Sequence, residues 1–320
     1  MVRIGLLATV VLTLGMVVPS AQLWPVWRFL AGMASAVVFV YVAGWCLARL
    51  TALGAPALAG LIFVGPGMGI TVSGLAASGM VASGWQAATA WAMFGALAAV
   101  LTALAWPQLR GTVTTSPVAT QAPAAAQGGA IAAFALAYGL AGFGYIVTAT
   151  FLPVIARQAL PGSIWLDLFW PLFGIGVAAG SLITIRLPVH WDRRHLLVGC
   201  YAMQTVGVLL TVAWPSLMGF ALGSLLLGLP FTAITLFAMQ EARRLRPQNA
   251  STLIGLLTAA YGLGQIVGPP MVAWLLQRSA SPAQGFAWSL QAAAAGLAIG
   301  GGLFAGLARL HPQAPAVRPT

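Results

Sequence analysis

The stretch PVWRFLAGMASAVVFVYVAGWCLA (Pro25 to Ala48) decides the class of fold, because Arg28 is its only charged residue. A bilayer core is about 30 Å thick, and a helix needs about 20 apolar residues to cross it. Similar runs recur along the chain, and their continuous apolar character excludes the strands of a membrane barrel. The sequence therefore predicts an all-α polytopic membrane protein with about ten transmembrane helices. We place these helices at residues 4–19, 25–48, 57–79, 86–106, 130–152, 164–186, 195–213, 217–240, 251–276 and 285–308.

The composition of the 320-residue chain supports this fold class. Hydrophobic residues make up 60% of the chain and charged residues 5%, whereas soluble domains carry about 25% charged residues. The 14 basic residues are all arginines, scattered between apolar runs, and 11 of them fall on the side that would hold Arg3. Because arginine is in excess on the cytoplasmic side, we expect both termini to be cytoplasmic in the cell inner (plasma) membrane. This scatter excludes the basic surface patch of a nucleic-acid partner.

The connections between spans are short except at Pro107 to Gly129, which is rich in Thr, Ser, Pro, Ala and Gln. This composition is typical of a flexible linker. We therefore expect an N-terminal bundle of four spans (1–106), a cytoplasmic linker (107–129), a six-helix bundle (130–310) and a cytoplasmic tail (311–320). Residues 1–22 also have the pattern of a cleavable signal peptide, and cleavage would leave nine spans.

Two parts of the chain share one pattern. Trp24-Pro25 opens a span that ends at Arg49, and the next span carries FVGPGMG. Trp214-Pro215 opens a span that ends at Arg243-Arg244, and the next carries IVGPPM. Weak duplication of a multi-helix unit is typical of secondary transporters, whose binding site lies between the repeats.

Three motifs resemble the major facilitator superfamily. RFLAGMASA (Arg28 to Ala36) resembles its fourth-helix motif, and GPGMG (Gly65 to Gly69) is similar to its fifth-helix Gly-Pro motif. WDRRHL (Trp191 to Leu196) is similar to the charged loop between its eighth and ninth helices. The stretches 137–163 and 228–245 look like the YbfB/YjiJ branch of these transporters.

The resemblance implies a major-facilitator-like architecture of two bundles, which the superfamily builds from six helices each. This chain begins where the third helix of that pattern should start, so we expect a 4+6 arrangement. Pro188 also stands where the charged loop of the family normally carries a glycine before Asp192.

Asp167 and Arg28 are the charged candidates for a proton and substrate pathway. Asp167 lies near the external end of its span, and a carboxylate in hydrocarbon is costly and therefore a functional candidate. The alternative is an interfacial carboxylate paired with Arg157. Arg28 opens its span on the external side, where it either faces a cavity and binds an anionic group or extends to the lipid interface.

Charged groups at cytoplasmic helix ends are the candidates for a conformational latch, a set of ion pairs that forms in one state of an alternating-access cycle. We select Asp192, Arg193, Glu241 and Arg243 for this role. The alternative is that they are solvated topology anchors, and we interpret Arg194, with Arg193, mainly as an anchor.

Polar groups within spans are expected to line the pathway where they face the bundle interior. These residues are Tyr138, Tyr145, Thr148, Gln204, Thr232, Tyr261 and Gln265. The Gly-Pro sites should bend their helices and permit close approach of backbones. They comprise Gly65, Pro66, Gly67, Gly69, Gly268, Pro269 and Pro270.

The sequence offers no catalytic set, no zinc-like spacing around His190 and His195, and no phosphate-binding loop. We therefore expect no enzyme, metal or cofactor. The leading hypothesis is a monomeric secondary transporter, namely a proton-coupled exporter of small organic solutes, whose partners are a small-molecule substrate, protons and the lipid bilayer. The repeat, the motif resemblance and the isolated Asp167 motivate this hypothesis. The alternative is a truncated, non-transporting membrane protein that acts at most as a scaffold.

Overall fold

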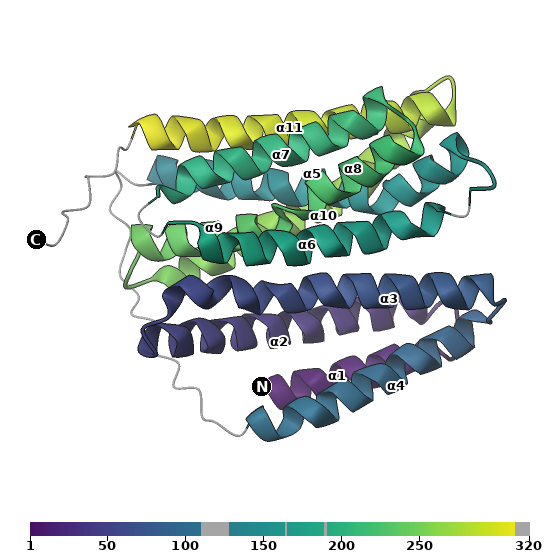
Figure 1. Ribbon diagram of the computed structural model, residues 1–320, viewed down its shortest axis with the longest axis horizontal. Coiled ribbons are helices and arrows are strands. Elements are labelled where there is room, and N and C mark those ends of the chain that lie inside the picture. The colour runs from purple at the N-terminus through teal and green to yellow at the C-terminus, as the bar shows by residue number, and fades with distance from the viewer. Residues whose placement is uncertain (110–127, 164, 189–190, 311–320) are drawn as a thin grey trace, which may run out of the picture. The chain divides into compact units, whose positions relative to one another are not determined.

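The structure is a computed structural model that describes residues 1–109, 128–163, 165–188 and 191–310 (Figure 1). Nine segments in these ranges are helical, long and apolar enough to cross a membrane. The chain is thus an all-α polytopic membrane protein. The elements are α1 (Val2–Gly15), α2 (Trp24–Ala52), η1 (Pro56–Phe63), α3 (Val64–Ala82), α4 (Ala87–Ala105), η2 (Trp106–Leu109), α5 (Gly128–Ala159), η4 (Leu166–Leu168), α6 (Phe169–Arg186), α7 (Arg193–Ala213), α8 (Leu217–Gly228), α9 (Phe231–Leu245), α10 (Ala250–Arg278) and α11 (Pro282–Leu310).

Helix α1 is shorter than the span expected at residues 4–19. It has 14 residues, which at about 1.5 Å per residue give about 21 Å, less than the thickness of a bilayer core. The helix ends at Gly15, and the Trp27 ring lies where a side chain at Gly15 would project. This apolar helix is therefore separate from the nine full-length candidate spans.

The span expected at residues 217–240 is broken into two helices. Helix α8 ends at Gly228 and α9 begins at Phe231, directly after Pro230. Proline favours the start of a helix because it has no N–H to donate. Together the two helices still form one apolar segment, Leu217–Leu245, that is long enough to cross a membrane.

The chain divides into two compact units, which we describe separately. Unit 1 comprises residues 1–62 and 73–116, and unit 2 comprises residues 63–72 and 117–320. The predicted first bundle covered residues 1–106, whereas residues 63–72 cluster with unit 2. Most of the predicted linker (107–129) and the whole predicted tail (311–320) lie outside the described residues.

In unit 1, α1 packs against both α2 and α4 (Figure 1). Close approach is possible because glycine lies at the crossings. A Cβ at Gly5 would meet Val38 of α2, and a Cβ at Gly95 of α4 would meet Leu14. Small residues are the usual means of bringing membrane helices together, since lipid supplies no hydrophobic driving force between them.

Unit 2 is held by helix crossings of the same kind. Helix α5 packs against α10 and α11, and α8 packs against α6 and α7. A Cβ at Gly264 of α10 would meet the Gly139 carbonyl of α5, and a Cβ at Gly180 of α6 would meet the Leu229 carbonyl. Tyr201 lies fully buried among these helices and donates a hydrogen bond to the Ala137 carbonyl at 2.8 Å.

The start of α3 packs on α6, and this contact explains why residues 63–72 belong to unit 2. Gly67 is buried, and a Cβ there would overlap the backbone of Ala178. The Thr71 hydroxyl lies within hydrogen-bonding distance of the Pro171 carbonyl, at 3.3 Å. The periodicity of the sequence does not reveal the contact between α3 and α6, because this contact depends on which helix backbones can approach each other closely.

Candidate functional site

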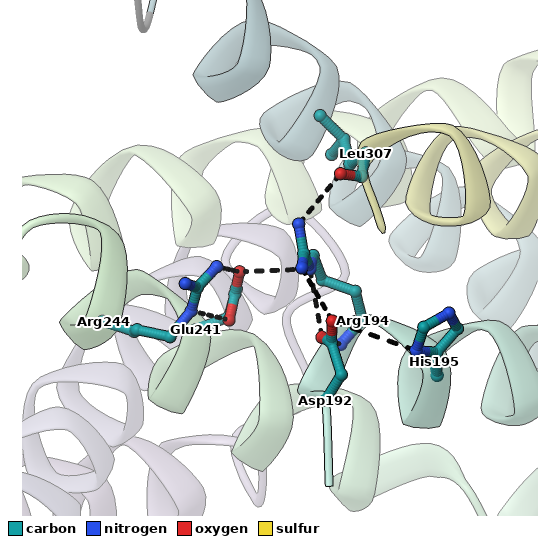
Figure 2. Close-up of polar contacts among 6 residues, drawn as sticks. All are labelled: Asp192, Arg194, His195, Glu241, Arg244 and Leu307. Carbon is teal, nitrogen blue, oxygen red and sulfur yellow. Dashed lines mark hydrogen bonds and ion pairs between the residues drawn. The ribbon is translucent and has the colours of Figure 1, made fainter. Parts of the chain in front are cut away.

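An ion cluster lies at the start of α7, beside the ends of α9 and α11 (Figure 2). Asp192 caps α7 by accepting a hydrogen bond from the Arg194 backbone N–H at 2.9 Å. The Arg194 guanidinium returns to the same carboxylate, with Nε to Oδ1 at 3.0 Å and Nη2 to Oδ2 at 2.7 Å. Its Nη1 donates to the Leu307 carbonyl of α11 at 2.9 Å. Arg194 therefore joins the start of α7 to the end of α11.

Glu241 of α9 supplies the second carboxylate of the cluster. The Arg244 guanidinium donates from Nε to Oε2 at 2.8 Å and from Nη2 to Oε1 at 2.6 Å, which is the two-bond geometry of a strong charge-assisted pair. The Arg194 Nε atom lies 3.8 Å from Glu241 Oε1. Through this contact the cluster joins α9 to α7 as well as to α11.

The oppositely charged side chains of the cluster pair with one another in a largely buried place. Two carboxylates pair with two guanidiniums, Arg193 adds a further positive charge that acts on both carboxylates, and the side chains of Arg194 and Glu241 are only 4% and 2% exposed. Burying a single charge costs far more than burying a paired one, so these groups depend on one another. Arg244 is 43% exposed and reaches solvent at the edge of the cluster.

The environment of Asp192 favours its ionised form. Partial burial, the largest single influence, raises the pKa of this carboxyl. The hydrogen bonds from Arg194 and its positive charge act in the opposite direction, with a further contribution from His195, and together they lower the pKa below its ordinary value. The Asp192 side chain is therefore an anion at neutral pH.

A second feature of unit 2 is a wall of aromatic rings from three helices, which we call the aromatic wall: Tyr145 of α5, Trp170 and Phe173 of α6, and Phe231 of α9. The Tyr145 ring centroid lies 4.5 Å from that of Phe231 and 5.9 Å from that of Phe173. Trp170 stacks on Phe173 at 5.1 Å with an interplanar angle of 16°. Only Phe173 is fully buried, so the other three rings keep part of their surface open.

Hydroxyl groups pair across the helices of unit 2. The Ser181 and Thr232 hydroxyls lie 2.7 Å apart, joining α6 to α9. The Tyr138 hydroxyl donates to Thr235 Oγ1 at 3.2 Å and so joins α5 to α9. In contrast, the Tyr145 hydroxyl has no hydrogen-bond partner among the described residues. The aromatic wall therefore presents one unsatisfied hydroxyl beside its ring faces.

A family model described as an uncharacterised MFS-type transporter, YbfB, matches residues 1–305. The chain belongs to this family. It is therefore a membrane transporter of the major facilitator type, a class of proteins that are not enzymes. No curated protein matches the chain.

The ion cluster of this YbfB-family chain brings together some of the predicted latch residues. Asp192 and Glu241 both belong to it, but their close arginine partners are Arg194 and Arg244. Arg193 instead lies over the Phe237 ring, at 5.8 Å from its centroid, and Arg243 is exposed. The interpretation of Arg194 as a solvated anchor is wrong, because its side chain is 4% exposed.

Helical spacing is the signal that identifies the correct partner of Glu241. Residues three apart lie on one face of a helix, whereas residues two apart do not. Arg244 is three residues after Glu241 and Arg243 is two residues after it. No comparable signal in the sequence identifies Trp170, Phe173 and Phe231, since aromatic residues are common in apolar spans.

Asp167 and Arg28 lie in different units. Asp167 belongs to η4, directly before α6, and is 41% exposed, with its Oδ1 atom 3.2 Å from Arg157 Nη2. The pairing of Asp167 with Arg157 is the contact that the alternative interpretation of Asp167 included. Arg28 is exposed at the start of α2 in unit 1, where its guanidinium lies 5.3 Å from the centroid of the Trp91 ring.

The remaining predicted pathway residues have different surroundings. The Thr148 hydroxyl is buried and donates to the Gly144 carbonyl of its own helix at 3.0 Å. Tyr261 packs on Tyr138, with ring centroids 5.1 Å apart, and Gln265 is half-buried one turn later on α10. Gln204 is buried and donates to the Leu227 carbonyl at 3.1 Å.

The Gly-Pro sites also differ from one another. Gly65 and Pro66 lie in the first turn of α3, where the span changes from the 3₁₀ segment η1 to an α-helix. Gly67 makes the close contact with α6, whereas a Cβ at Gly69 would meet nothing. Gly268, Pro269 and Pro270 lie inside α10, and a Cβ at Gly268 would meet Ile146 of α5.

Proposed function

We propose that this chain is a secondary transporter that exports small organic solutes across the cell inner membrane by alternating access, coupled to protons. Membership of the YbfB family supports a membrane transporter in general. The observation that carries the mechanism is the buried ion cluster, because it joins the ends of three helices of unit 2 by contacts that break when these ends move apart.

The ion cluster acts as the latch of one state. While it is closed, its pairs lie in a medium of low dielectric constant and attract strongly. When the ends of α7, α9 and α11 separate, water enters and each exposed pair contributes about 0–1 kcal/mol. The cluster therefore stabilises the state in which the cytoplasmic side is closed. Because water weakens its ion pairs once the helix ends separate, the cluster can distinguish the closed state from the open one.

The aromatic wall is the surface we assign to the solute. Ring faces bind apolar and planar groups, and the Tyr145 hydroxyl adds one polar contact without introducing a charge. The substrate of this surface is therefore a small organic molecule with an apolar or aromatic face. Cationic aromatic solutes also fit, since cations are attracted to the faces of aromatic rings.

Asp167 is the carboxylate we assign to proton coupling. It lies at the start of α6, whereas Asp192 follows the end of that helix, so the two groups are near opposite ends of one span. The Asp167 side chain is 41% exposed and has an arginine partner 3.2 Å away. Protonation would remove that ion pair and so alter the contact between the segments that carry Asp167 and Arg157.

Everted membrane vesicles that contain the full chain test the proposal, with ethidium as a planar cationic probe. Export from the cell corresponds to uptake into such vesicles, and an acidic interior should drive it. Asp167→Asn should abolish the dependence on the pH gradient, and Tyr145→Leu should lower the rate at every pH. Tyr41→Leu is the matched control, because Tyr41 is a half-buried tyrosine of unit 1.

Each outcome decides one part of the proposal. Uptake that does not respond to the pH gradient would be consistent with a transporter but would overturn the proposal of proton coupling. An equal effect of Tyr145→Leu and Tyr41→Leu would overturn the assignment of the aromatic wall. No uptake above vesicles that lack the chain would favour the non-transporting scaffold for this class of solute.

A further inference from the structure

Helices α1 and α4 enclose an apolar groove in unit 1. The groove has a volume of about 350 Å³ and is lined by Leu7, Val10, Ala99, Thr102, Ala103 and Trp106. The lining residues extend over about 10 Å from Ala99 to Trp106 but over only about 4.5 Å from Leu7 to Val10, since each residue advances a helix by about 1.5 Å. Thr102 is the one hydroxyl-bearing residue of an otherwise apolar lining.

A cation lies at one end of this groove. Arg3 is one helical turn before Leu7, so the two side chains share one face of α1. The Arg3 guanidinium lies 4.8 Å from the centroid of the Trp106 ring, and its Nη2 donates to the Trp106 carbonyl at 3.3 Å. Tryptophan and arginine at a helix end are typical of the level at which lipid headgroups lie.

Arg3 keeps donors that the described residues leave unsatisfied. A guanidinium has five N–H donors, and one of them is directed at the Trp106 carbonyl. Its Nε atom is buried and has no acceptor among the described residues. The remaining Nη donors and the positive charge of the guanidinium can act on an anionic acceptor that approaches from outside, and such charge-assisted hydrogen bonds are strong.

We propose that α1 and α4 bind one anionic phospholipid, with an acyl chain in the groove and the headgroup phosphate against Arg3. The apolar lining fits a chain, and the charge of Arg3 is complementary to a phosphate and to a headgroup with net negative charge. Zwitterionic lipids carry a compensating positive group in the headgroup, so they gain less from the same arginine. The site therefore selects the lipid by its headgroup and orients it by its chain.

Native mass spectrometry of the full chain in detergent tests this site. Phosphatidylglycerol and phosphatidylcholine with the same acyl chains are added in parallel, and the occupancy of the first bound lipid is compared. We expect phosphatidylglycerol to bind more tightly and Arg3→Gln to weaken it about fivefold, which corresponds to about 1 kcal/mol for one basic residue. Ala103→Phe fills the groove without touching the charge, and we expect it to weaken both lipids.

Arg278→Gln is the matched control, because Arg278 lies 4.4 Å from the centroid of the Trp274 ring but belongs to unit 2. It should leave the binding of phosphatidylglycerol unchanged. Equal losses for Arg3→Gln and Arg278→Gln, or equal binding of the two lipids to the unsubstituted chain, would overturn the proposal. If Arg3→Gln fails to fold, Ala103→Phe decides alone, and unchanged lipid occupancy in that variant would be the refuting result.

Discussion

Replacing Arg194 with glutamine should destabilise unit 2 more than replacing any exposed arginine. The substitution removes both side-chain hydrogen bonds to Asp192, the bond to the Leu307 carbonyl and the contact with Glu241. Asp192, 16% exposed, then loses the guanidinium that bonds to it, and Glu241, 2% exposed, keeps its bonds from Arg244 and the longer-range attraction of Arg193. The negative charges of these two carboxylates are then left in a largely buried place, where water solvates them poorly.

The structure gives the size of this effect. Breaking a buried ion pair from one side costs about 3–5 kcal/mol. For domains of 150–250 residues, about 1 kcal/mol shifts the melting temperature by about 2–4 °C, so a fall of about 6–20 °C is expected. Arg157→Gln is the matched control, since the Arg157 and Asp167 side chains are 64% and 41% exposed and such pairs contribute about 0–1 kcal/mol.

The assay is thermal unfolding in detergent, followed with a thiol-reactive dye. Cys46 lies in α2 of unit 1 and Cys200 in α7 of unit 2, so a Cys46→Ser background makes Cys200 the reporter of unit 2. Arg194→Lys, which keeps the charge but loses the planar two-bond geometry, should melt between the unsubstituted chain and Arg194→Gln. If Arg194→Gln and Arg157→Gln melt at the same temperature, the ion cluster does not stabilise unit 2 and the reasoning is refuted.

Three further predictions concern stability and use the same assay. The lowered pKa of Asp192 means that this group stabilises the fold above its unfolded pKa of about 3.9, and that the contribution is lost as pH falls through the folded pKa. The difference between the unsubstituted chain and Asp192→Asn should therefore be full at pH 7 and shrink below about pH 4; a constant difference would contradict it. Gly264→Ala should cost about 1–3 kcal/mol because its Cβ would press on the α5 backbone, whereas Gly262→Ala, which meets nothing, should be neutral or gain up to about 1 kcal/mol. Ser224→Ala should be neutral or stabilising, since the buried Ser224 hydroxyl has no hydrogen-bond partner within the described part of the chain, and a loss above about 1 kcal/mol would show that it has one.

Much of the fold could be predicted because membrane insertion depends on local properties. The apolar length of each run identified every full-length span, and Pro and Gly marked most ends within a few residues. The prediction that a span ends at residue 152 was wrong, because α5 continues through Pro153 to Ala159. Two local departures had weaker signals. Helix α1 ends at Gly15 rather than near residue 19, and Pro230 divides the span at 217–240 into α8 and α9.

The candidate site was predicted only in part. The scarcity of acidic residues drew attention to Asp192 and Glu241, since a carboxylate near hydrocarbon is costly unless it is paired. The partner of Glu241 could have been found from the spacing of three residues to Arg244. The contact of Arg194 with Leu307 could not, because 113 residues separate the two in the chain.

The sequence by itself determined that this protein is a bundle of membrane-spanning helices and which few charged groups it could use. That information is local, because the hydrophobic length of a segment decides whether it can cross a bilayer. Only the tertiary structure decided which groups meet: Arg194 with Glu241, the rings of the aromatic wall, and Arg3 with Trp106. Those contacts depend on how each helix is rotated and how closely its neighbour approaches, and glycines at several crossings within each unit permit that approach.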